Sequence, residues 1–342
     1  MRSMLAARYL GPHRIEPVET PVPSLGKEEA LIRVDACGFC GSDIGIVSGV
    51  HPRAKAPLTI GHEFCGRIAA IQTNNQEFEI GNFVTLFPLI SCGDCFVCRN
   101  GNPHVCRTLR LYGFDADGGM ADYVKVPVKN LIKLPDDMPS HLGAIIEPLA
   151  VAVHGVSRAP LGEVRTAVVI GAGPIGILSA LVARARGIEQ VLISDVIPFR
   201  RALAASLGLT AVAAGDELKT LVHNQTSGEG ADLIVECAAA VTSASEMTSL
   251  VRSRGTIVNL SVFKKPVSVD LQAVNFKELT IVGSRVYTRH DFAEAITLAS
   301  TLPLERIVTH FFSLPEVQSA FSCFERGEGV CKVLVLPNRA AQ

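Results

Sequence analysis

The chain has 342 residues, of which 48% are hydrophobic and 19% charged, and its formal net charge is −1. This length and composition allow two domains of ordinary size with large apolar cores. The near-neutral charge, without a basic block, argues against nucleic-acid binding through an extended positive surface. No apolar run reaches the ~18 to 20 residues that span a membrane, and residues 1–10 lack the apolar core of a signal peptide.

The first 140 residues and the residues after about 164 predict different folds. In the first part, the apolar runs 30–34, 66–71 and 83–86 are separated by Gly, Pro and Asn clusters, which suits a folded-over, barrel-like all-β domain. In the second part, strands alternate with helices, which predicts a doubly wound parallel sheet of the α/β class. We expect strands at 167–170, 191–194, 233–236, 256–260 and 280–282, and helices at 174–186, 199–207 and 243–251. The tail reads helix 291–300, strand 308–312, helix 315–324 and strand 332–336, and we expect it to rejoin the first domain.

The ten cysteines bear on both metal binding and compartment. In a chain of this size without a signal peptide, metal ligands are a better interpretation than disulfides, and the cytoplasm is the expected location. Five cysteines belong to no candidate ligand set and are expected to behave as small apolar residues. These five are Cys37, Cys65, Cys237, Cys323 and Cys331.

Four other cysteines form the most specific motif of the chain. Two-residue gaps separate Cys92, Cys95 and Cys98, and Cys106 follows after seven intervening residues. Four thiolates at this spacing can surround one tetrahedral zinc ion and leave no open position for a substrate. The motif therefore predicts a structural zinc site rather than a redox motif or an exposed cysteine cluster.

A second group of residues has the donor types of a catalytic zinc site. Cys40 and His62 offer a thiolate and an imidazole, and a catalytic zinc needs only three protein ligands beside an exchangeable position. Either Glu147 or Glu63 can complete the set; we favour Glu147 as ligand or near-ligand, with Glu63 as a close second. Ser42 is the candidate for passing the proton of an alcohol towards solvent.

A glycine-rich turn predicts a dinucleotide site. Gly171, Gly173 and Gly176 follow an expected strand and open an expected helix, whose first turn contains Pro174 and Ile175. The glycines permit a tight turn, a close approach of the backbone to a pyrophosphate, and close packing of the helix.

The next expected strand ends at Asp195, which predicts NAD rather than NADP. A carboxylate there accepts hydrogen bonds from a ribose hydroxyl and repels a ribose phosphate. Arg200 and Arg201 lie close by in the sequence and weaken this preference, because a phosphate could use them.

Other side chains are candidates for supporting roles. We expect Asp43 to orient the imidazole of His62. If an arginine faces the pocket, a carboxylated or polyhydroxylated substrate is favoured, because guanidinium groups bind such groups well. The candidates for lining the pocket, in addition to Ser42, are Phe87, Arg110, Tyr112, Arg285 and Tyr287.

Together these motifs resemble the zinc-containing medium-chain dehydrogenase family over nearly the whole chain. The landmarks are Cys37-Gly-Phe-Cys40-Gly-Ser-Asp43, Gly61-His-Glu-Phe-Cys-Gly66, the four-cysteine motif, Glu147-Pro-Leu-Ala-Val-Ala-Val-His154 and Gly171-Ala-Gly-Pro-Ile-Gly176. The run that starts at Glu147 and the segment 275–288 look similar to the polyol branch, which includes sorbitol, butanediol, threonine and sugar-acid dehydrogenases.

The resemblance implies a GroES-like catalytic domain over residues 1–148 and 286–342, with a structural-zinc lobe at about 90–108, and a Rossmann domain over 149–285. It also implies two zinc ions per chain, NAD as cofactor, and a homodimer or homotetramer. By resemblance, Cys40, His62 and Glu147 take the catalytic-zinc positions with Glu63 next to the metal, and the four clustered cysteines take the structural-zinc positions.

One departure from the family concerns the proton path. Many relatives have a histidine five residues after the catalytic cysteine, where this chain has Gly45. The path must then end at Ser42, run through water, or use His51.

These features predict an NAD-dependent oxidation of a secondary alcohol in a polyol, sugar acid or related small sugar, without nucleic-acid or membrane partners. A butanediol- or threonine-type substrate is the nearer alternative. A non-catalytic cofactor-binding scaffold that keeps the fold is the more distant one, and it would hold metal only at the four-cysteine motif.

Overall fold

The computed structural model describes residues 2–338, and the chain divides into two compact units. One unit combines the chain up to Glu147 with the segment from Ile307 onward, and the other runs from Pro148 to Arg306. The division expected from the sequence differs mainly at the second boundary, where the chain returns to the first unit. Residues 286–306, expected in the first domain, belong with the second unit. Among the described residues, no helix has the length and apolar character needed to cross a membrane.

The first unit is built mainly on strands, as its short apolar runs predict. They are β1 (Ser3–Gly11), β2 (Arg14–Pro21), β3 (Glu29–Gly38), β4 (Leu58–Thr59), β5 (Glu63–Gln72), β6 (Phe83–Leu86), β7 (Leu89–Ile90), β8 (Arg110–Leu111), β9 (Tyr123–Pro127), β10 (Leu131–Lys133), β17 (Val308–Ser313) and β18 (Lys332–Leu336). The main sheet has the order β10-β6-β5-β3-β18-β17, and β9 also pairs with β3. A β2-β1-β4 sheet and a β7-β8 pair complete the unit.

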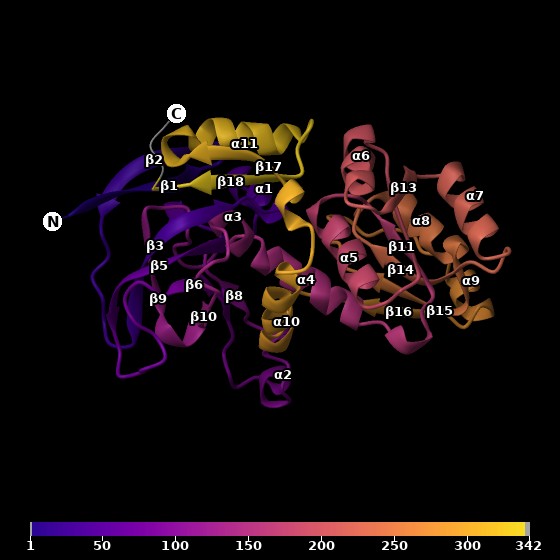
Figure 1. Ribbon diagram of the computed structural model, residues 1–342, viewed down its shortest axis with the longest axis horizontal. Coiled ribbons are helices and arrows are strands. Elements are labelled where there is room, and N and C mark those ends of the chain that lie inside the picture. The colour runs from indigo at the N-terminus through magenta and orange to yellow at the C-terminus, as the bar shows by residue number, and fades with distance from the viewer. Residues whose placement is uncertain (1, 339–342) are drawn as a thin grey trace. The chain divides into compact units, whose positions relative to one another are not determined.

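The C-terminal segment returns to this first unit, as its strand and helix pattern predicts. Strand β18 pairs antiparallel with β3 and parallel with β17, so the yellow end of the chain lies beside the indigo strands in Figure 1. The helices of the unit are α1 (Gly41–Val47), α2 (Phe96–Arg99), α3 (Ser140–Gly143) and α11 (Val317–Arg326). From α11, the rings of Phe321 and Phe324 contact Phe39 at centroid distances of 5.9 and 5.6 Å. These aromatic contacts anchor the backbone just before Cys40.

The second unit is a parallel sheet with helices, as the alternating pattern predicts. Its strands are β11 (Thr166–Ile170), β12 (Gln190–Asp195), β13 (Thr210–Ala213), β14 (Ala231–Glu236), β15 (Val251–Asn259) and β16 (Thr280–Gly283). Its helices are α5 (Pro174–Ala185), α6 (Pro198–Ser206), α7 (Asp216–Gln225), α8 (Val241–Leu250), α9 (Leu271–Phe276) and α10 (Arg289–Ala299), while α4 (Ile146–Ser157) starts at the end of the first unit. The strand order β13-β12-β11-β14-β15-β16 buries an apolar core of Val168, Ile170, Leu192, Ile234 and Ile257.

Helix α10 is tied to the second unit by a buried hydrogen bond and an ion pair. Nδ1 of His154 lies 2.9 Å from Oδ2 of Asp291, and both side chains are buried. Nη2 of Arg186 lies 2.7 Å from Oε1 of Glu294. Asp291 also accepts hydrogen bonds from the backbone and the hydroxyl of Thr288, which closes a capping box at the start of the helix. These contacts explain why α10 stays with the second unit.

Replacing Asp291 with Asn should lower the free energy of unfolding by about 2 kcal/mol, because charge-assisted hydrogen bonds of a buried carboxylate are lost. Burial alone would raise the pKa of Asp291, but hydrogen bonds from His154 and Thr288 outweigh it and lower the pKa from 3.8 to about 2. The stabilisation is therefore complete above pH 3.8 and is lost as the pH falls towards 2.

Urea unfolding of the wild type and of Asp291→Asn at neutral and acidic pH measures this difference. The matched control is Glu189→Gln, whose carboxylate lies 3.6 Å from Arg165 at the exposed surface. This variant should have nearly wild-type stability. Equal losses of stability in the two variants would contradict the role assigned to Asp291.

Candidate metal and cofactor sites

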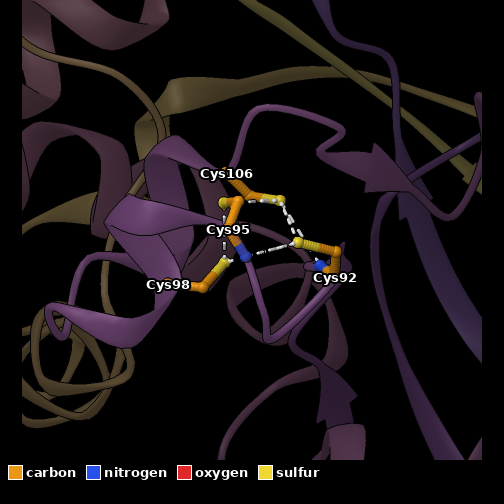
Figure 2. Close-up of side chains that lie close together, drawn as sticks. All are labelled: Cys92, Cys95, Cys98 and Cys106. Carbon is orange, nitrogen blue, oxygen red and sulfur yellow. Dashed lines mark hydrogen bonds between the residues drawn. The ribbon is translucent and has the colours of Figure 1, made fainter.

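The four clustered cysteines converge on one point, as Figure 2 shows. The Sγ–Sγ distances are 3.5 Å for Cys95–Cys98, 3.9 Å for Cys92–Cys98, 3.5 Å for Cys92–Cys106 and 3.9 Å for Cys95–Cys106. Four sulfurs bound tetrahedrally to zinc at ~2.3 Å lie ~3.8 Å from one another, so the observed distances fit that ion.

The environment of these cysteines also favours metal binding. Backbone N–H groups of Cys95 and Asp94, together with the thiol of Cys106, lower the pKa of Cys92 to about 6. A thiolate is therefore present at neutral pH, and the thiolate is the form that binds metal. The backbone N–H of Cys92 donates in turn to Sγ of Cys106 at 3.3 Å. Four sulfur donors fill a tetrahedral site, so the lobe can hold a metal but not a substrate.

A second donor group lies in the first unit, where Cys40, His62 and Glu63 come together. One ligand atom of each lies within 4.8 Å of the others. Cys40 caps the N-terminus of α1, and Glu63 opens β5 directly after His62. The imidazole and the carboxylate are almost fully removed from solvent. Thiolate, imidazole and carboxylate are a donor set that zinc accepts in catalytic sites.

The geometry groups Glu63, rather than Glu147, with Cys40 and His62, whereas the sequence favours Glu147 as ligand or near-ligand with Glu63 second. Glu147 is buried in the first turn of α4, and its negative charge acts on His62 and on Lys332. However, it is not a member of the donor group that the described residues form around Cys40. Glu147 therefore lies near this group rather than in it.

Two buried atoms of this site support a bound cation. Nδ1 of His62 and Oδ1 of Asp43 make no hydrogen bond within residues 2–338. Burial would lower the pKa of His62, but the charges of Cys40 and of nearby carboxylates raise it to about 10. The surroundings of His62 thus favour a positive charge. A metal ion supplies that charge when it displaces the proton of the imidazole. The residues fit a zinc ion.

The expected hydrogen bond between Asp43 and His62 is not formed. Oδ2 of Asp43 accepts instead from the backbone N–H of Cys40 at 2.8 Å. Asp43 therefore fixes the turn that carries Cys40, while its charge still acts on His62.

A buried ammonium group adjoins this donor group, and sequence reasoning missed it. Nζ of Lys332 forms an ion pair with Glu63 and donates to the carbonyl oxygen of Phe39 at 2.8 Å. The side chains of Lys332 and Glu63 are only 3% and 2% exposed. The one signal in the sequence is a lysine that opens the otherwise apolar run 332–336, since lysine is rarely buried without a charged partner.

The residues expected to form a proton path have different surroundings. The hydroxyl of Ser42 is buried without a hydrogen-bond partner among residues 2–338, and a Cβ on Gly45 would meet no atom within 4 Å. Nδ1 of His51 accepts from the backbone N–H groups of Arg53 and Ala54 at 3.4 and 3.1 Å. The neutral ring therefore carries its proton on Nε2. Burial and the charge of Arg53 lower the pKa of His51, so this side chain is a poor proton acceptor.

The residues expected to line the pocket differ in their surroundings. Tyr287 is fully buried and packs against Phe292 in the second unit, with ring centroids 5.3 Å apart. Arg285 is exposed in that unit. Arg110 is exposed in the first unit and donates to the carbonyl oxygen of Asp115 at 3.1 Å.

The loop that follows β8 contributes an aromatic residue that the sequence did not single out. Phe114 contacts the rings of both His51 and His62 edge-on, each at a centroid distance of 4.9 Å. Tyr112, from the same loop, lines a groove beside β1, β2 and β9. The aromatic side chain in contact with His62 is therefore Phe114 and not Tyr112.

The glycine-rich turn lies between β11 and α5, as predicted. Gly171 has a φ of +99°, and a Cβ on Gly176 would lie 1.8 Å from the carbonyl oxygen of Gly171. Both positions therefore require glycine. A Cβ on Gly173 would meet no atom within 4 Å, and Pro174 and Ile175 begin the helix directly behind it. This open backbone at a helix N-terminus fits a pyrophosphate.

The carboxylate of Asp195 is held rigidly at the end of β12. Its two oxygens accept from the backbone N–H groups of Ala172 and Ile197, each at 2.8 Å. Nη1 of Arg200 lies 3.6 Å from Oδ2 of Asp195, and Arg201 donates to the carbonyl oxygen of Asp195 at 2.9 Å. Arg201 is thus hydrogen-bonded to the chain itself, whereas Arg200 forms an ion pair with Asp195 and its Nε makes no hydrogen bond among the described residues.

Comparison with known protein families and curated proteins gives matches over most of the chain. Residues 26–136 match the alcohol dehydrogenase GroES-like domain, and residues 174–301 match the zinc-binding dehydrogenase family. An L-threonine 3-dehydrogenase of Bacillus subtilis is 35% identical over 331 residues, which covers 93% of this chain and 94% of the relative. A 2-dehydro-3-deoxy-L-galactonate 5-dehydrogenase of Pseudoalteromonas atlantica is 34% identical over 336 residues, with 97% and 98% covered.

Solved structures give the same result. A zinc-binding dehydrogenase of Sinorhizobium meliloti, bound to NADP, has a TM-score of 0.92 and 32% identity, covering 98% of this chain and 100% of that one. An alcohol dehydrogenase of Escherichia coli, complexed with NADH, has a TM-score of 0.90 and 30% identity with the same coverage. These matches confirm the expected GroES-like and Rossmann architecture. The chain therefore belongs to the zinc-containing medium-chain alcohol and polyol dehydrogenase family.

Proposed function

We propose that this protein oxidises a secondary alcohol of a polyol, sugar acid or related small sugar and passes the hydride to NAD. The observation that carries the proposal is the buried convergence of Cys40, His62 and Glu63. The substrate class is supported by relatives that are a sugar-acid dehydrogenase and, at 32% identity, a sorbitol dehydrogenase. Threonine is the second candidate, because several relatives are threonine dehydrogenases.

The proposal includes two zinc ions per chain. Cys40, His62 and Glu63 would hold the catalytic ion, with Glu147 close by, and the four clustered cysteines would hold the structural ion. A zinc ion lowers the pKa of an alcohol hydroxyl and so eases loss of its proton. Four reduced cysteines in one lobe also support a cytoplasmic location.

The chain's own residues supply the rest of the chemistry. Ser42 hands the alcohol proton to water in the open space beside Gly45. His51 is a fixed hydrogen-bond donor rather than a proton relay, because its Nδ1 lone pair is occupied. The glycine-rich turn places the nicotinamide cofactor, which accepts the hydride when bound.

The preference for NAD is supported by Asp195. Its carboxylate is fixed by two backbone N–H groups, so it cannot turn away from an incoming phosphate. Arg201 already donates to the backbone carbonyl oxygen of Asp195, and Arg200 is paired with the Asp195 carboxylate, so a ribose phosphate would compete with Asp195 for it. A hydroxyl suits this environment better than a phosphate does.

A homodimer, or a homotetramer built from such dimers, is supported by the exposed edge of the second sheet. Strand β16 is an edge strand, and its Ile281 is exposed together with Leu271 and Phe276 of α9. An exposed apolar edge strand invites pairing with another strand. Two copies of β16 can pair antiparallel about a twofold axis, which gives a self-complementary contact.

The wild type should reduce NAD with one class from a panel of polyols, sugar acids, diols and threonine, and chelation should abolish this activity. Cys40→Ala should lower kcat/KM by at least about 10³-fold, because metal catalysis contributes several kcal/mol. Steady-state kinetics and a metal count test this. The matched variant Cys323→Ala, on α11, should keep wild-type activity. Full activity in Cys40→Ala, or one metal ion in the wild type, would contradict the proposal.

Asp195→Ser should shift the ratio of kcat/KM for NAD to that for NADP by about 100-fold towards NADP. A charged acceptor for the ribose hydroxyl is lost together with the repulsion of a phosphate. Kinetics with both cofactors measure the ratio. Asp216→Ser, which changes an exposed acid at the start of α7, should leave the ratio unchanged. The preference for NAD would be wrong if the wild type used NADP equally well.

Sedimentation should show the wild type at two or four times its chain mass of 36.4 kDa, and Ile281→Lys should move it to the chain mass. A lysine on an edge strand opposes strand pairing. Ile80→Lys, which changes an exposed isoleucine of the first unit, is the matched control and should sediment like the wild type. If Ile281→Lys has no effect, β16 is not the contact.

A further inference from the structure

A fully buried carboxylate, that of Glu236, holds the loop that follows β14 in the second unit. Its Oε1 accepts from the backbone N–H groups of Ala238 and Ala239 at 2.9 and 3.0 Å. The hydroxyl of Ser243, in the first turn of α8, donates to the same oxygen at 2.7 Å. Ala239 has a φ of +53°, a left-handed conformation that a residue other than glycine keeps only where its surroundings impose it. Glu236 therefore fixes this loop in a conformation that the loop would not favour alone.

The same residue also holds the loop that follows β15. Oε2 of Glu236 accepts from the hydroxyl of Ser261. The carbonyl oxygen of Glu236 accepts from the backbone N–H groups of Leu260 and Ser261 at 3.0 and 3.2 Å. These contacts follow from the register, in which Glu236 lies beside Asn259, the last residue of β15. The two loops are thus joined to each other through one side chain.

Both loops lie at the edge of the sheet where a dinucleotide binds. Strands β11 and β14 are neighbours although β12 and β13 come between them in the chain, and a doubly wound sheet binds its ligand at the carboxyl ends of strands at such a point. A Cβ on Gly171 would lie 3.0 Å from Cα of Ala238, so the loop after β14 adjoins the glycine-rich turn. Asp195 lies on the β12 side, where it would meet the adenosine ribose. The nicotinamide half must then extend the other way, over the ends of β14 and β15.

We propose that Glu236 is a positioning residue, which holds these two loops together as one preformed wall for the nicotinamide half of the cofactor. It acts through the loops and does not itself need to touch the cofactor. This inference rests on the NAD cofactor of the proposed function. A wall that is ordered before binding lowers the entropy cost of binding, because fewer groups must be fixed when the ligand arrives.

The test compares two ligands that differ in the nicotinamide ring, using the full chain. NADH binding is followed by the fluorescence of the reduced nicotinamide, and ADP-ribose, which lacks that ring, is measured by its displacement of NADH. Glu236→Ala should raise the Kd of NADH at least about tenfold, because two N–H groups and two hydroxyls lose their acceptor and the loops lose their fixed conformation. The Kd of ADP-ribose should stay within about twofold of the wild type, since this ligand does not reach the wall.

Three further variants separate the role of Glu236 from a general loss of stability. Glu236→Gln keeps an oxygen for the two backbone N–H groups and an amide that can donate to Ser261, so its Kd for NADH should stay within about threefold of the wild type. Ser261→Ala frees only the loop after β15, does not empty the buried position, and should raise the Kd of NADH about fivefold. Glu189→Gln changes an exposed acid before the start of β12, at the opposite edge of the sheet, and should bind both ligands as the wild type does.

Equal losses of affinity for NADH and ADP-ribose in Glu236→Ala and Ser261→Ala would overturn the inference, because Glu236 would then support the whole unit rather than the nicotinamide wall. Wild-type affinity for NADH in these two variants would overturn it as well. A wild-type chain that binds neither ligand would overturn this inference and the proposed function together. The first two results concern Glu236 alone, because they leave NADH binding to the wild type intact.

Discussion

Buried negative charge is the constraint on which the catalytic unit depends. One thiol and three carboxyl groups, from Cys40, Asp43, Glu63 and Glu147, lie at or near one point and largely out of solvent. Like charges in a region of low dielectric repel one another, and each loses its hydration. Among residues 2–338, Lys332 supplies a buried cation beside these groups, and the negative charge that remains favours binding of a further positive charge.

Because of this buried negative charge, the return of the C-terminal segment to the first unit has a chemical consequence as well as a structural one. Strand β18 does not merely extend the main sheet, because its first residue carries the ammonium that pairs with Glu63. Helix α11, which precedes β18, packs two phenylalanine rings against Phe39 and so holds the turn that leads to Cys40. A single segment thus sets both the position of one donor and the charge beside another, so changes in the tail should affect the metal site.

The sequence could predict what is encoded in short spacings. The cysteines from 92 to 106 and the glycines from 171 to 176 each bring their own partners within a few residues, so pattern and site coincide. The pair of Glu63 and Lys332 spans 269 positions and depends on the register of three strands, which no local pattern specifies. The positions of Glu147 and Glu63 relative to Cys40 also depend on tertiary contacts, so the sequence alone could not decide which of the two lies closer to Cys40. Strand β13 was missed because it is short and only partly buried.

A buried carboxylate is stabilised in a different way in each of the two units. Glu63 is balanced by a full positive charge, that of the buried ammonium of Lys332. Asp195 is balanced mainly by backbone N–H dipoles, with Arg200 farther away at 3.6 Å, so it keeps most of its negative charge. Each carboxylate oxygen has a second lone pair, so Asp195 can still accept from a ribose hydroxyl while it repels a phosphate. Because a relative with the same fold binds NADP, this choice must depend on such side chains rather than on the fold.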